Sequence, residues 1–126
     1  MIVGIGTDIV SARRIQAVQM QMGDRFAKRI LTPDEFHLYE QRKRSYLYLA
    51  SRFAAKEATA KALGTGIGKV SFRDIETQHT ENGAPFIMLY RHAKILKNKL
   101  NIQNIHLSVS DEKEFVVAFV IMEGKN

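Results

Sequence analysis

The sequence predicts one α+β domain in which an antiparallel sheet packs against a long central helix. Three observations support this fold class. The first ten residues are mostly apolar, as in a buried strand; the middle of the chain is rich in Ala, Leu, Lys and Glu, which favour a helix; and residues 104–111 alternate between apolar and polar side chains. The chain has 126 residues, enough for one compact domain and too few for two ordinary ones, so residues 1–126 are assigned to a single domain.

Caps and breakers define the expected helices. Ser11 is suited to cap the first one, and Gly23-Asp24 interrupts it. The segment Thr32-Pro33-Asp34-Glu35 starts another, because Thr at the N-cap, Pro at N1 and Glu at N3 form a capping box. The central helix consists of strong helix formers and stops at the glycine-rich turn 64–68. The helices are expected at 11–22, 25–30, 32 to about 42–44, 46–63 and 93–100.

Alternation and turn residues define the expected strands. Residues 72–80 alternate loosely, and Glu81-Asn82-Gly83 is a hairpin signal that leads into a second strand. The last strand is almost continuously apolar, which predicts a central place in its sheet or a place at a subunit interface. The strands are expected at 2–10, 72–80, 86–90, 104–111 and 115–122.

Composition excludes several classes of function. The chain has no Cys, so disulfides, thiol catalysis and Cys-based zinc sites are excluded. No apolar run is long enough to span a membrane and no signal peptide is evident, so the protein is expected to be soluble and cytoplasmic. The net charge of +6 suggests an acidic partner: nucleic acid, an anionic membrane, a phosphorylated small molecule or an acidic protein. Solubility alone explains that charge about as well.

Two segments carry residue types suited to chemistry. On the central helix, Phe53, Glu57, Ala60 and Lys61 share one face, and a carboxylate beside an ammonium suits a metal and a phosphate held side by side. Near the N-terminus, Asp8 is a lone carboxylate among apolar residues, and its burial would be costly without a partner. A cation shared between Asp8 and Glu57 would supply that partner.

Together these segments resemble the phosphopantetheinyl transferases, specifically the small holo-(acyl-carrier-protein) synthase group. The first motif of that family is Gly-x-Asp, here Gly6-Thr7-Asp8, and the second is a Phe/Trp-x-x-Lys-Glu-x-x-x-Lys helix, here Phe53 to Lys61. A third motif begins with a His on a strand, here His106 to Asp111. The resemblance extends from Ile2 to near Met122 and implies the 4′-phosphopantetheinyl transferase fold.

The resemblance also implies an activity. It is the transfer of 4′-phosphopantetheine from coenzyme A to a serine of apo acyl carrier protein, with Mg²⁺, releasing adenosine 3′,5′-bisphosphate. It further implies a homotrimer with active sites at the subunit boundaries. A water or a carboxylate takes the serine proton, and Glu57 is the better candidate. The carrier belongs to fatty-acid synthesis or to a polyketide or peptide synthetase, and the short single domain resembles the fatty-acid type.

Site residues follow from matching motif positions. The resemblance assigns Mg²⁺ to Asp8 and Glu57, and a coenzyme A phosphate to Lys61, so these three are the expected catalytic residues. The other expected coenzyme A contacts are Lys43, Arg44, Arg52, Gly64 and His106. The expected carrier contacts are Arg14, Arg25 and Phe26.

The residues by themselves leave structural alternatives open. Glu57 and Lys61 could form an i,i+4 ion pair, worth only about 0.3–0.5 kcal/mol. Asp8 could be a turn or cap residue, Gly64 a helix stop, and His106 a structural residue. For the whole chain, the rivals are a basic nucleic-acid-binding module and a noncatalytic trimeric scaffold. Scattered basic residues and the absence of Trp argue against the nucleic-acid module, so no nucleic acid or membrane partner is expected.

Overall fold

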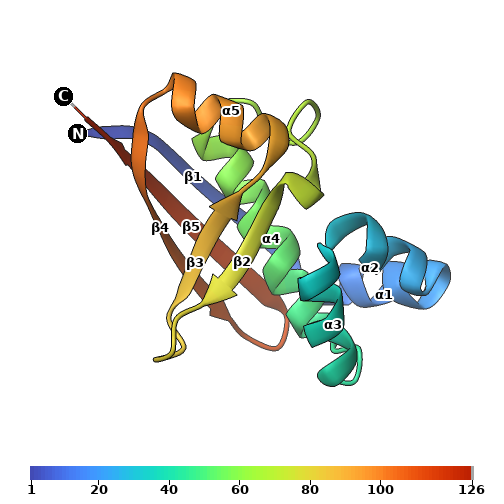
Figure 1. Cartoon of the computed structure of the whole chain (residues 1–126). Coiled ribbons are helices and arrows are strands. Elements are labelled where there is room, and N and C mark those ends of the chain that lie inside the picture. The colour runs from blue at the N-terminus through green and yellow to red at the C-terminus, as the bar shows by residue number, and fades with distance from the viewer. Residues whose placement is uncertain (126) are drawn as a thin grey trace.

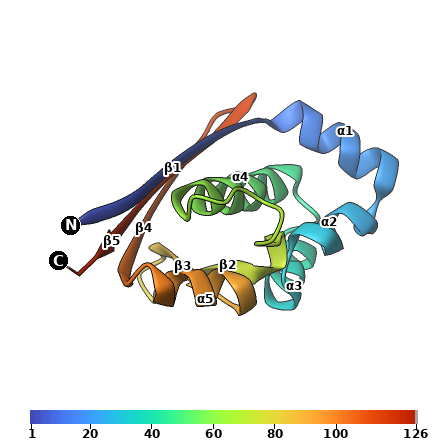
Figure 2. The same ribbon diagram turned by 90° about the horizontal axis from the view of Figure 1, so that it is seen from above.

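The computed structural model describes residues 1–125. Two antiparallel sheets lie on either side of the longest helix, α4, and three shorter helices gather at one end of it (Figures 1 and 2). The elements are β1 (Ile2–Ser11), α1 (Ala12–Met22), α2 (Asp24–Ile30), α3 (Pro33–Gln41), α4 (Tyr46–Ala62), a 3-10 helix (Phe72–Asp74), β2 (Ile75–His79), β3 (Pro85–Leu89), α5 (Arg91–Lys99), β4 (Ile102–Asp111) and β5 (Phe115–Gly124). The predicted fold class, an antiparallel α+β domain built on a long helix, is confirmed.

The larger sheet has the order β1-β5-β4, so the last strand is central, as its apolar sequence predicts. Alternate residues of β5 face α4 and are fully buried: Val116, Ala118, Val120 and Met122. They pack against the alanines of α4 in the core. The other face of β5 stays partly open, and Phe115, on that face, is 46% exposed.

Glycines allow β1 to cross α4 at very short range. A Cβ added at Gly6 would overlap the carbonyl oxygen of Ala58 and lie 2.8 Å from the backbone nitrogen of Ala62. A Cβ at Gly4 would overlap the Ala62 carbonyl oxygen in the same way. The glycine of the first motif therefore sets the distance between strand and helix, and with it the distance from Asp8 to the residues of α4.

We expect Gly6→Ala to be strongly destabilising, because backbone atoms of α4 cannot move aside as a side chain could. The free energy of unfolding should fall by about 3 kcal/mol or more, the upper end for overpacking. Urea denaturation followed by circular dichroism would measure the change. Gly68→Ala is the matched control, since a Cβ there meets no atom within 4 Å. Equal stability of the two variants would show that the crossing is not tight.

Some predicted boundaries need correction. The strand predicted at 72–80 begins with the 3-10 helix, because the Asp74 side chain accepts a hydrogen bond from the Ser71 backbone N–H at 3.1 Å and closes a capped turn. Three other elements differ from the expected bounds by about two residues: α5 begins at Arg91, β4 begins at Ile102 and β5 reaches Gly124. The capping box of Thr32 and Glu35 is confirmed.

Candidate active site

Asp8 and Lys61 meet where β1 crosses α4. Asp8 pairs in the sheet with Ala118, on the face toward α4. The Lys61 ammonium donates to the Asp8 carboxylate oxygen Oδ1 at 3.2 Å and to the Thr7 carbonyl at 3.0 Å. The other oxygen of Asp8, Oδ2, is buried and has no hydrogen-bond partner within residues 1–125. A buried carboxylate oxygen without a partner is costly, and a bound cation would satisfy it.

Glu57 lies one helical turn before Lys61 and is half-buried. Burial raises the pKa of the Glu57 carboxyl above its ordinary value, the nearby charge of Asp8 raises it further, and Lys61 opposes both. The structure pairs Lys61 with Asp8 and shows no Glu57–Lys61 ion pair among the described residues. The i,i+4 ion pair between Glu57 and Lys61, which was the structural alternative for these residues, is therefore not formed.

Two close carboxylates and an unpartnered oxygen are the arrangement that a divalent cation would stabilise. In the described part of the chain, no group of three or more His, Cys, Asp or Glu side chains could hold a metal by itself. A cation held by Asp8 and Glu57 would thus need further oxygen ligands from water or from a substrate. Mg²⁺ binds in this way, with one or two protein carboxylates plus waters and phosphates.

The raised pKa of Glu57 gives a testable pH dependence in metal-free protein. A raised pKa in the folded state means that the Glu57 contribution to stability is present below its ordinary pKa of 4.5 and is lost as pH rises through the folded pKa. Glu57→Gln should therefore be more stable than wild type at about pH 7, by less than about 1 kcal/mol because solvent screens the charges, and equal to it at about pH 4. Urea denaturation in EDTA would measure this; a variant that is less stable at neutral pH would contradict it.

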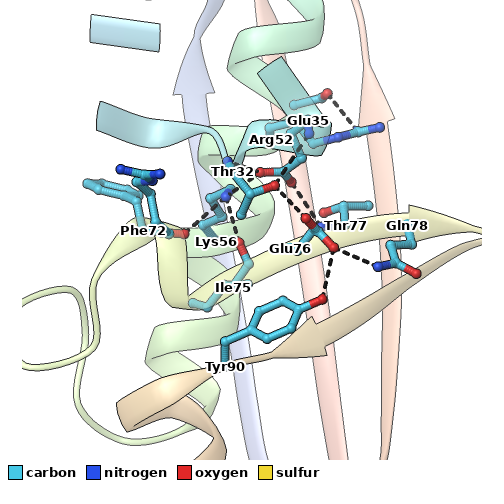
Figure 3. Close-up of polar contacts among 12 residues, drawn as sticks. Thr32, Glu35, Arg52, Lys56, Phe72, Ile75, Glu76, Thr77, Gln78 and Tyr90 are labelled. Carbon is cyan, nitrogen blue, oxygen red and sulfur yellow. Dashed lines mark hydrogen bonds and ion pairs between the residues drawn. The ribbon is translucent and has the colours of Figure 1, made fainter. Parts of the chain in front are cut away.

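The opposite side of α4 carries a buried polar network (Figure 3). The Lys56 side chain is fully buried, and its ammonium donates to Glu35 Oε1 at 2.6 Å and to the carbonyls of Ile75 at 2.6 Å and Phe72 at 3.0 Å. The second Glu35 oxygen accepts the Thr77 backbone N–H at 2.9 Å. Burial lowers the pKa of Lys56, and Glu35 partly offsets that effect. The network therefore joins α4 to α3, the 3-10 helix and β2.

Sequence reasoning missed this role of Lys56, although Lys56 belongs to the second motif. The spacing of the motif puts Lys56 one residue before Glu57 and so on a different face of the helix. The carboxylate that pairs with Lys56 is Glu35, and the sequence identifies Glu35 only as a capping-box residue. In the structure Glu35 caps α3, through the Thr32 N–H at 2.9 Å, and also binds Lys56.

Arg52 is one turn before Lys56 and is only 6% exposed. Its guanidinium stacks on the Tyr48 ring, 4.4 Å from the ring centre, and its Nε lacks a hydrogen-bond partner in the described chain. Arg42, which the sequence did not single out, also stacks on Tyr48 at 5.1 Å. Burial and the positive charges of Arg52 and Arg42 lower the pKa of His79. Arg42 and His79 line a cavity of about 590 Å³ between α3 and the β2–β3 hairpin, which also contains the carboxylates of Asp34, Glu35 and Glu76 and is therefore of mixed charge.

The other predicted cations lie in the turn between α3 and α4, residues 42–45, which we name the basic turn. Lys43 is exposed, and no described ion pair includes it. Arg44 binds Asp24 through two nitrogens, at 3.0 and 3.1 Å, and Glu40 at 3.3 Å. Gly64, with a φ of 84°, follows Leu63, the C-cap of α4, and acts as a helix stop, consistent with the structural alternative.

His106 is not near Asp8 within one chain. It pairs in the sheet with Ile121, whereas Asp8 pairs with Ala118, so the two side chains leave opposite faces of the sheet. The His106 ring is 2.6 Å from a carboxylate oxygen of Glu123. The structure thus joins Asp8, Glu57 and Lys61 and does not add His106 to them.

Two of the three predicted carrier contacts share a surface beside this site. Arg14 and Phe26 line a largely apolar cavity of about 310 Å³, together with Phe53 of α4. Phe53 lies one turn before Glu57 and contacts Phe26 with ring centres 6.4 Å apart. Arg25 is exposed and does not line the cavity.

Fold and site define a small α+β protein in which an acidic pair and a lysine meet at a strand–helix crossing. The chain belongs to the 4′-phosphopantetheinyl transferase superfamily, whose family model matches residues 4–120. It is 50% identical over 125 residues to the holo-[acyl-carrier-protein] synthase of Shewanella oneidensis, covering 98% of both chains.

Solved structures agree with this assignment. The chain is similar to the crystal structure of holo-[acyl-carrier-protein] synthase from Neisseria meningitidis, with a TM-score of 0.90, 49% identity and coverage of 98% of this chain and 99% of that one. It is also similar to the Bacillus anthracis synthase solved in complex with coenzyme A (3′,5′-ADP), with a TM-score of 0.82, 43% identity and 99% coverage of both chains.

Proposed function

We propose that the protein is a holo-(acyl-carrier-protein) synthase, which transfers 4′-phosphopantetheine from coenzyme A to a serine of apo acyl carrier protein. Family membership and the relatives at 48–50% identity over nearly the full chain support this activity. The observation that supports it most directly in the structure is the Asp8–Glu57–Lys61 cluster. There a buried, unpartnered carboxylate oxygen and a carboxyl of raised pKa lie beside an ammonium.

Asp8 and Glu57 are the proposed ligands of Mg²⁺. When bound, Mg²⁺ would neutralise charge that develops on the pyrophosphate of coenzyme A. The serine oxygen forms a bond to the phosphorus that carries pantetheine, and the bond from that phosphorus to the bridging oxygen breaks. The bridging oxygen keeps the electron pair and leaves on adenosine 3′,5′-bisphosphate. Lys61 stabilises the departing phosphate, and Glu57 is the proposed acceptor of the serine proton.

Two of the predicted cations lie on α4, but on opposite sides of it. Arg52 and Lys61 are nine residues apart, which is about 14 Å along the helix axis and half a turn around it. Coenzyme A carries a pyrophosphate and a 3′-phosphate at two ends of its ribose. We assign the pyrophosphate to Lys61 and the 3′-phosphate to the charged surface around Arg52 and Lys43. Arg14 and Phe26, at the apolar cavity, are the proposed contacts of the carrier protein, and Arg25 is a further one beside it.

We further propose a homotrimer whose sites lie between subunits. The outer face of the larger sheet exposes Ile5, Ile9 and Phe119 at 59%, 64% and 38%, a contiguous apolar surface that suits a partner. His106 leaves that same face and would reach coenzyme A in the site of a neighbouring copy. Light scattering on the purified protein would test the oligomeric state.

No helix within residues 1–125 is long and apolar enough to cross a membrane. A place in fatty-acid synthesis in the cytoplasm is part of the same proposal, because it follows from the function and not from the fold.

Mass spectrometry tests the activity. Apo acyl carrier protein incubated with the protein, coenzyme A and Mg²⁺ should gain the mass of one phosphopantetheinyl group, and EDTA should prevent the gain. No gain on a carrier that is confirmed to be apo and folded would count against this function for that carrier class.

A further inference from the structure

The backbone of the basic turn is strained. Lys43 and Arg44 are consecutive non-glycine residues with φ of 57° and 54°, in the left-handed region that ordinary side chains disfavour. Two such residues in a row persist only where the surroundings hold them in place. Because the turn ends at Ser45, whose hydroxyl caps α4 through the Tyr48 N–H at 3.2 Å, its conformation also sets how the chain enters α4.

Two hydrogen bonds hold the backbone of Arg44 in this conformation. Its backbone N–H donates to the Tyr39 carbonyl at 2.9 Å, and its own carbonyl accepts from the Gln19 amide nitrogen at 2.8 Å. The same Gln19 nitrogen also donates to the buried Tyr39 hydroxyl at 2.6 Å. A carbonyl oxygen only accepts hydrogen bonds, so the Gln19 amide must present its nitrogen to the turn.

The Arg44 guanidinium is occupied by carboxylates. Its Nε and Nη2 bind the two oxygens of Asp24, the first residue of α2, and Nη2 also binds Glu40. This bidentate geometry is the one with which an arginine would otherwise bind a phosphate. Neither Arg42 nor Lys43 enters an ion pair among residues 1–125, but Arg42 stacks on Tyr48, so the exposed ammonium of Lys43 is the charge that the turn can offer to a phosphate.

We propose that Gln19, Asp24 and Arg44 form a brace that fixes the basic turn, and that Arg44 is a positioning residue for Lys43 and not a phosphate ligand. The inference rests on the proposed function, since it takes Lys43 to be a contact of coenzyme A. It departs from the expectation that Arg44 itself meets the substrate. The brace also connects helix α1, which carries Arg14, to the turn that leads into α4, at the end of α4 where α1, α2 and α3 gather (Figure 1).

The variants Asp24→Asn, Arg44→Gln and Gln19→Leu separate the two roles of Arg44. If the left-handed turn is populated only about one tenth of the time without its brace, each variant should raise the KM for coenzyme A about tenfold and leave kcat nearly unchanged. The double variant Asp24→Asn/Arg44→Gln should be no worse than either single one, because both remove the same link. Gln21→Leu, an exposed glutamine of the same helix, is the matched control and should behave as wild type.

If Arg44 were itself a phosphate ligand, Asp24→Asn should not raise the KM for coenzyme A. Freeing Arg44 from Asp24 would then leave the KM unchanged or lower it, while Arg44→Gln alone would raise it, and that pattern would overturn the proposal. Thermal denaturation of each variant controls for loss of folded protein.

Hydrogen exchange tests the brace without any turnover. The Arg44 amide should exchange faster in Gln19→Leu than in wild type, because the turn then opens more often. Equal exchange would reject the brace even in an active enzyme. If the wild type transfers no phosphopantetheine, the proposed function fails, and the exchange data still decide whether the brace exists.

Discussion

Lys56→Met should lower the free energy of unfolding by about 3–5 kcal/mol, which is the usual effect of removing one partner of a buried ion pair. Methionine nearly matches the length of the lysine side chain but leaves Glu35 charged and 1% exposed, with only backbone donors to stabilise it. The carbonyls of Ile75 and Phe72 lose their ammonium donor as well. Urea denaturation of variant and wild type would measure the difference.

Two further variants make this expectation specific. Lys94→Met removes an exposed lysine of α5 and should change stability by no more than about 0.5 kcal/mol. Adding Glu35→Gln to Lys56→Met removes the unpaired charge, so the double variant should be less destabilised than the sum of the single changes. A loss below about 1 kcal/mol in Lys56→Met would mean that water or another group replaces the ammonium.

Lys56 illustrates what sequence reasoning could and could not predict. The helix and its stop are predicted by local rules, as is the capping box of Thr32 and Glu35. Which side chain Glu35 meets across 21 residues of sequence is a matter of tertiary packing, which no local spacing encodes. A lysine in a helix is most often solvated, so reasoning from the sequence alone assigns Lys56 to the solvent and misses its burial.

The candidate site also combines features that the sequence predicts with features that only the structure shows. Asp8, Glu57 and Lys61 could be grouped from two motifs, and the structure brings them together. The reason for their closeness, the glycines at the crossing, needs the path of the backbone. The alternation of residues 104–111 does place His106 on the polar face of its strand, but that this face points away from Asp8 depends on the sheet register. The pairing of Arg44 with Asp24 depends on how α2 packs and could not be predicted from the sequence.

Asp8→Ala should reduce kcat/KM for coenzyme A by at least about 10³-fold at saturating Mg²⁺, the scale on which lost electrostatic stabilisation of a transition state is felt. The reason is that one oxygen of the Asp8 carboxylate is buried and no other group of residues 1–125 satisfies it. Fold should survive, because Lys61, the partner it leaves, is 49% exposed. Calorimetry should show that Mg²⁺ binding is lost together with turnover.

The double variant of Asp8 and Glu57 tests whether the two carboxylates bind one shared cation or act independently. If Asp8 and Glu57 hold the same ion, either substitution by alanine removes it, so the double variant should be hardly slower than either single one. Two separate structural roles would instead give losses that multiply. Glu114→Gln, at an exposed carboxylate between β4 and β5, should keep activity within about twofold and so controls for the general loss of negative charge. Near-normal Mg²⁺-dependent turnover in Asp8→Ala would remove the metal from this crossing, and with it the proposed placement of the pyrophosphate beside Lys61.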